Sequence, residues 1–107
     1  MATQATAGVS SNPGTATVIF NSALPGTDYR LKKQMIVELV QDEAGRFVVC
    51  EPTTGVFHDD VTWPAALEGF IQAFVNQFEF LQRKETDLSA SLAAELDRFR
   101  YLLGPRS

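Results

Sequence analysis

Residues 57–81 read FHDDVTWPAALEGFIQAFVNQFEFL, and here the spacing of apolar side chains changes from that of a strand to that of a helix. Thr62 is a suitable helix N-cap, and Pro64 is tolerated in a first helical turn. Beyond it, apolar side chains recur every three or four residues in one stripe: Leu67, Phe70, Ile71, Phe74, Val75, Phe78 and Leu81. The stretch therefore predicts an amphipathic helix of roughly 20 residues with an aromatic buried face.

Short stretches rich in β-branched residues precede this helix and predict strands. They are Thr15–Phe20, Met35–Val40, Arg46–Glu51 and the shorter segment Val56–His58. Asp42–Gly45 separates the middle two and is typical of a hairpin loop. We therefore expect a small antiparallel sheet of three or four strands before the helix.

A second helix is expected after the polar segment 83–86, with Asp87 or Ser89 as its N-cap. Gly104-Pro105 ends it, and its apolar stripe consists of Leu88, Leu92, Leu96, Phe99 and Leu103. Strands followed by helices indicate the α+β class: a small antiparallel sheet packed by a long amphipathic helix, then a C-terminal helix. One such domain is predicted over 15–107, with residues 1–14 as a flexible N-terminal tail.

Composition limits the possible functions. The 107 residues suffice for one domain, and the formal net charge is −4. That acidity disfavours nucleic acid and anionic membranes as partners, because both attract positive charge. No apolar run approaches the ~18 residues of a membrane span, and the single cysteine, Cys50, permits no internal disulfide. These features favour a reducing, cytoplasmic location.

Several short motifs follow one another between Ile36 and Leu81. In chain order they are Asp42, Gly45, Arg46-Phe47-Val48-Val49, Pro52, Gly55 and Thr62–Leu67. Their order and spacing resemble the HicB-like antitoxin family. The resemblance implies a partial RNase H-like core without nuclease activity, which binds a small basic ribonuclease toxin and masks its active site. The chain ends in one helix instead of the DNA-binding module usual in such antitoxins, so we expect no direct DNA binding.

The resemblance predicts a non-enzymatic domain that binds a partner protein and, in the antitoxin case, neutralises it. Charge and position make the candidate partner-binding residues Glu51, His58, Asp59, Asp60 and Trp63. The acidic groups would face basic residues of the partner. Trp63 would either anchor the interface or pack the first helical turn on the sheet.

Two other functions stay open. Phe80, Tyr101 and Leu102 leave apolar side chains in surplus, which predicts a homodimer or higher homo-oligomer formed through the C-terminal helix or an exposed strand edge. The protein would then be a structural or accessory subunit of a larger assembly. A small ligand-binding domain or enzyme would instead use Cys50 and His58, if they met across neighbouring strands. We expect no catalytic site, cofactor or metal.

Overall fold

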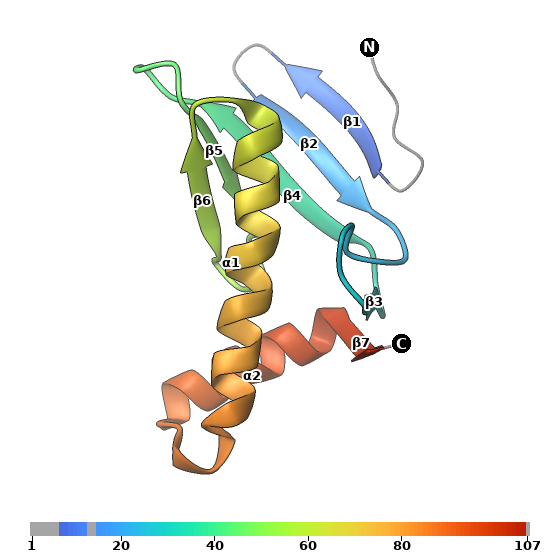
Figure 1. Ribbon diagram of the computed structural model, residues 1–107, viewed down its shortest axis with the longest axis vertical. Coiled ribbons are helices and arrows are strands. Elements are labelled where there is room, and N and C mark those ends of the chain that lie inside the picture. The colour runs from blue at the N-terminus through green and yellow to red at the C-terminus, as the bar shows by residue number, and fades with distance from the viewer. Residues whose placement is uncertain (1–6, 13–14, 107) are drawn as a thin grey trace.

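The computed structural model describes residues 7–12 and 15–106 (Figure 1). A five-stranded antiparallel sheet has the strand order β1-β2-β4-β5-β6. Its strands are β1 (Ala7–Asn12), β2 (Thr15–Phe20), β4 (Met35–Gln41), β5 (Phe47–Cys50) and β6 (Phe57–Asp60). A second, two-stranded sheet pairs β3 (Tyr29–Leu31) with β7 (Leu103–Arg106).

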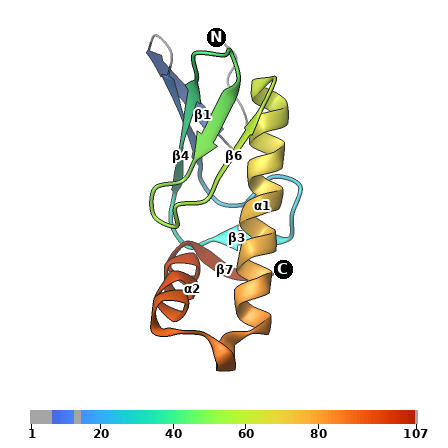
Figure 2. The same cartoon turned by 90° about the vertical axis from the view of Figure 1, so that its left-hand side faces the viewer.

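Two helices complete the fold, and the α+β class predicted from the sequence is confirmed. α1 (Trp63–Arg83) lies along one face of the large sheet, and α2 (Ala90–Leu102) lies beyond the end of that sheet (Figure 2). Each helix has an N-cap that the sequence predicts. Thr62 Oγ1 accepts a hydrogen bond from Ala65 N at the start of α1, and Ser89 Oγ accepts one from Leu92 N at the start of α2. Ser89 is the cap of α2, whereas Asp87 ends the short 3₁₀ helix η1 (Glu85–Asp87).

The large sheet has one strand more than predicted. The prediction of a flexible tail over residues 1–14 is wrong for Ala7–Asn12, which form β1 and pair with β2 along its whole length. Their own sequence is a weak strand former, so the neighbouring β-branched strand directs their pairing. The other residues of that tail, 1–6 and 13–14, lie outside the described residues.

The core lies between the sheet and the helices. Strands β2, β4 and β5 contribute Val18, Phe20, Met35, Val37 and Val49, each at most 2% exposed. The helices contribute Phe70, Phe74, Phe78 and Phe99, and the rings of Phe74 and Phe99 lie 4.7 Å apart between centroids. This confirms that the aromatic stripe of α1 is core. Phe80 lies off the stripe and is exposed as expected, whereas Leu102 is buried, contrary to its assignment to surplus surface.

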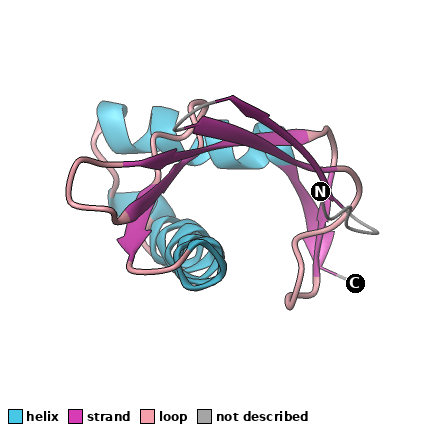
Figure 3. Cartoon of the chain, turned by 90° about the horizontal axis from the view of Figure 1, so that it is seen from above, coloured by secondary structure: helices cyan, strands magenta, loops and turns pink. Residues whose placement is uncertain are grey.

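The opposite face of the large sheet is covered by neither helix (Figures 2 and 3). We call it the open face. Strand register assigns to it the described residues Thr15, Thr17, Ile19, Ile36, Glu38, Val40, Val48, Cys50, Phe57 and Asp59. Because side chains alternate along a strand, each of these residues has neighbours in sequence that point to the helix-covered face.

Candidate functional site

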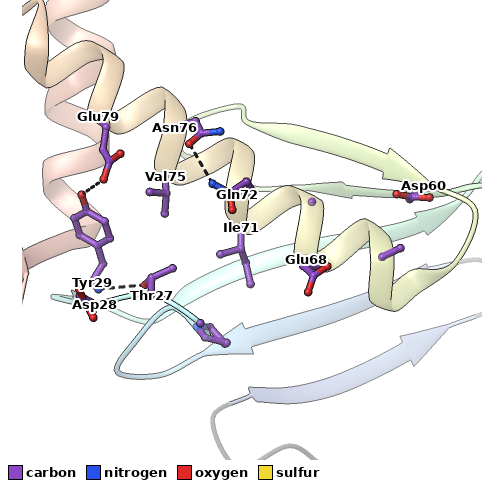
Figure 4. Close-up of a pocket in the computed structure, with 14 residues that line it drawn as sticks. Thr27, Asp28, Tyr29, Asp60, Glu68, Ile71, Gln72, Val75, Asn76 and Glu79 are labelled. Atoms are coloured by element: carbon purple, nitrogen blue, oxygen red, sulfur yellow. Dashed lines mark hydrogen bonds between the residues drawn. The ribbon is translucent and has the colours of Figure 1, made fainter.

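A cleft of about 770 Å³ lies between α1 and the segment Pro25–Tyr29, which is the end of the loop from β2 to β3 together with the first residue of β3 (Figure 4). Leu24 anchors this loop because its side chain is buried in the core. Gly26 adopts the left-handed backbone conformation, with φ of 75°, that the Pro25-Gly26 turn requires. Thr27 Oγ1 donates to the carbonyl of Leu24 at 2.9 Å and accepts from the backbone N–H of Tyr29 at 3.1 Å. The loop is therefore a fixed wall.

The facing wall is the flank of α1 that borders its buried stripe. Glu68, Ile71, Gln72, Val75 and Asn76 line it at helical spacing. Ile71 and Val75 are the apolar part of this wall, and Gln72 Nε2 donates to Asn76 Oδ1 at 3.2 Å to give it a polar ridge. The wall can thus contact both the methylene groups and the polar ends of a long side chain.

Tyr29 joins the two walls at one end of the cleft. Its hydroxyl donates to Glu79 Oε2 at 2.8 Å, so a residue of the loop is tied to a residue of α1. Its ring packs edge-on against Phe78, with centroids 5.6 Å apart and planes at 77°. The buried ring and its hydrogen bond fix the separation of the walls at this end.

Carboxylates dominate the charge of the cleft. Asp28, Asp60, Glu68 and Glu79 line it, and among its described lining residues there is no Lys or Arg. Asp60 lies on β6, where its Oδ1 accepts from the N–H of Val61 at 2.7 Å. Four carboxylates along a concave surface produce a negative potential that attracts a cationic group.

His58 and Asp60 are the predicted partner-binding residues that project to the helix side of the sheet. His58 Nε2 lies 3.9 Å from Asp60 Oδ2. The imidazole also lies against α1 at Gly69, where an added Cβ would collide with Nε2. Gly69 is therefore needed for the close approach of His58, which positions β6 and its Asp60 beside the helix.

Asp59 projects to the open face, away from Asp60. Arg46 Nε donates to Asp59 Oδ2 at 2.8 Å. This hydrogen bond lowers the pKa of Asp59 and raises the pKa of Arg46 relative to their ordinary values. Although Asp59 and Asp60 are adjacent in sequence, they lie on opposite faces of the sheet and therefore cannot both contact the same surface of one partner.

Glu51 is a structural residue in the described fold. Its side chain is 2% exposed, and its carboxylate accepts from Thr53 N, Thr54 N and Thr54 Oγ1 at 2.8, 2.7 and 2.6 Å. It organises the loop 52–55 and is not accessible to a partner. Trp63, by contrast, is 41% exposed at the start of α1 and is accessible.

Cys50 and His58 do not meet across neighbouring strands, as the enzyme alternative would require. In the strand register Cys50 pairs with Phe57 and His58 pairs with Val49, so thiol and imidazole project from opposite faces. Burial, followed by the charge of Glu38, raises the pKa of Cys50, which disfavours a reactive thiolate. Across residues 7–12 and 15–106, no group of three or more His, Cys, Asp or Glu side chains could hold a metal ion.

Sequence reasoning misses most of the cleft. Glu68 and Glu79 are eleven residues apart on one helix, and that spacing already places them on the same side of α1, at the edge of the apolar stripe beside Val75. Asp28 and Tyr29 carry no comparable signal, because their position depends on how the connection from β2 to β3 folds against the helix.

A comparison of the chain with protein-family models, with curated proteins and with solved structures gives no match. Within the part of the chain that the structure describes, neither helix combines the length and the apolar character of a membrane span.

Proposed function

We propose that this protein is a non-enzymatic interaction domain that binds a basic partner protein, in a role similar to that of HicB-like antitoxins. The observation that carries the proposal is the acidic cleft: four carboxylates and no described Lys or Arg line it. The formal net charge of −4 has the same sign and would speed encounter with a basic protein. A single cysteine in the chain agrees with a cytoplasmic location.

The shape of the cleft favours a polypeptide segment as the ligand. Glu68 and Glu79 are eleven residues apart on α1, which corresponds to roughly 16 Å along the helix axis. An extended chain covers that length with about five residues. The apolar side chains Ile71 and Val75 lie between the two carboxylates, so they can contact the methylene stems of Lys or Arg while the carboxylates bind the charged ends.

The chemistry of the chain supports binding over catalysis. Cys50 and His58 are the sole cysteine and histidine of the sequence, and they lie on opposite faces of the sheet. A nucleophile and a base need to be within hydrogen-bonding distance of each other. The side chains around the cleft therefore act through charge and shape.

Affinity capture with charge-reversed variants tests the proposal. The cleft variant carries Asp60→Lys and Glu68→Lys, and the control carries Glu43→Lys and Asp97→Lys on exposed sites outside the cleft. Each substitution changes the charge by +2, so both double variants go from −4 to 0. The tagged proteins are incubated with the host lysate, and eluates are examined by mass spectrometry and light scattering.

We expect the unmodified protein and the control to capture the same small basic protein at fixed stoichiometry. The cleft variant should bind the purified partner at least about tenfold more weakly, because like charges then face each other. Equal losses in the two double variants would mean that net charge alone governs binding. Full retention by the cleft variant would remove the cleft from the interface.

A further inference from the structure

The open face of the sheet presents apolar side chains that no described residue covers. Ile36, Val40 and Phe57 are 49%, 38% and 66% exposed, and Val48 is half-buried. Val40 and Val48 are register partners on β4 and β5, so they form an apolar pair near the end of the face where the two strands meet their hairpin loop. Several exposed apolar side chains on one face are typical of an interaction site.

Two charged side chains on the open face, Glu38 and Arg46, have polar atoms that form no hydrogen bond to any described residue. Glu38 is exposed on β4, and among the described residues its carboxylate forms no hydrogen bond or ion pair. Arg46 uses Nε to bind Asp59, while its two Nη groups form no hydrogen bond to any described residue. The Asp59 bond holds the Arg46 guanidinium over the same face as Glu38.

The positions of Glu38 and Arg46 fit a two-fold axis. Arg46 lies four residues before Cys50, the register partner of Glu38. At ~3.4 Å per residue and ~4.8 Å between strands, the two positions are roughly 14 Å apart. Their midpoint falls between Val40 and Val48. A two-fold axis that runs parallel to the sheet over this midpoint, perpendicular to the line from Glu38 to Arg46, brings the glutamate of one copy opposite the arginine of the other, twice.

We propose that the open face packs against the open face of a second copy of this chain, about a two-fold axis over Val40 and Val48, with Glu38 of each copy paired to Arg46 of the other. The surface is then self-complementary, as a symmetric dimer requires. Face-to-face packing of two sheets is a common way of covering such a surface.

The size of the open face predicts a weak dimer. Five strands spaced ~4.8 Å apart and about 20 Å long present roughly 500 Å² per copy. A standard stable interface buries about 800 Å² per partner. The dimer should therefore form and dissociate reversibly across the micromolar range.

Sedimentation velocity on the full chain, from micromolar to millimolar concentration, tests this dimer. The unmodified protein should dimerise reversibly. Glu38→Arg alone and Arg46→Glu alone should each be monomeric, because each places like charges opposite each other. An equimolar mixture of the two variants should form a heterodimer, since one variant then carries arginine at both positions and the other carries glutamate at both. Circular dichroism checks that each variant is folded.

A matched pair of surface variants locates the interface independently. Val40→Arg should abolish dimerisation, whereas Phe80→Arg, at a similarly exposed apolar side chain on α1, should not. The cleft variant with Asp60→Lys and Glu68→Lys should dimerise normally, which separates this proposal from the partner-binding one. An unmodified protein that stays monomeric at millimolar concentration overturns the proposal. So does a dimer that survives Val40→Arg, or a variant mixture that stays monomeric.

Discussion

The two faces of the large sheet use the same strands but have different surroundings. On β4, Met35 and Val37 are fully buried under the helices, while Ile36 between them is 49% exposed. A nearly continuous apolar run of this kind is typical of strands that are covered on both faces. The helix α1 covers one face of the sheet. The apolar side chains of β4 on the open face indicate that this face is covered too, which the proposed dimer would do.

The largest predicted effect comes from removing one aromatic ring from each face. Phe74 is fully buried against Phe70 and Phe99, so Phe74→Ala should lower the free energy of unfolding by about 3–5 kcal/mol. Phe57 is 66% exposed on the open face, and Phe57→Ala should change it by less than about 0.5 kcal/mol. Urea denaturation of dilute protein measures both. Similar losses at the two positions would contradict the assignment of the faces.

The next largest expected effect on stability separates two carboxylates, the buried Glu51 and the exposed Glu38. Glu51 is buried and accepts three hydrogen bonds, so Glu51→Gln should cost about 1–3 kcal/mol, because the amide places donors against the N–H groups of the 52–55 loop. Glu38→Gln, on the open face, should leave the stability of dilute protein within about 0.5 kcal/mol of the original. Urea denaturation compares the two variants. A neutral Glu51→Gln would mean that the loop does not depend on this carboxylate.

Because His58 contacts Gly69, we expect Gly69→Ala to lower stability when His58 is present and to raise it when His58 is replaced by alanine. In the unmodified background, Gly69→Ala should be destabilising by about 1 kcal/mol or more, because the imidazole must leave its place against α1. In a His58→Ala background the same substitution should stabilise by up to about 1 kcal/mol, since alanine favours the helix more than glycine does. Thermal denaturation of the four proteins measures this coupling. Equal effects in both backgrounds would show that the two residues do not interact.

The smallest effect concerns Asp59, which is exposed and bound to Arg46. The hydrogen bond from Arg46 lowers the pKa of Asp59 below its ordinary value of 3.8. Its contribution to stability is therefore present above the ordinary pKa and is lost as the pH falls through the lowered pKa. Arg46→Met should raise the pKa of Asp59 toward 3.8, and NMR titration of the carboxyl carbon measures it. An unchanged pKa would exclude the ion pair in solution.

Local patterns in the sequence predict the local features of this fold. The 3.6-residue period predicts α1 with its buried phenylalanines, and Ser89 is among the expected caps. Pairing between distant segments is not predictable in this way. β1 depends on the neighbouring strand β2, and the register of β5 with β6 depends on how the connection 51–56 folds around Glu51. That register separates Cys50 from His58 and decides that Asp60, and not Asp59, lies on the helix side of the sheet.

Methyl NMR of isoleucine- and valine-labelled protein during dilution gives the sharpest test of the division between the two faces. We expect concentration-dependent shifts for Ile36, Val40 and Val48 on the open face. Val18, Val37 and Val49 in the core, and Ile71 and Val75 in the cleft, should stay constant. A spectrum that does not change over the whole dilution, or one in which only the cleft methyls move, would contradict this division.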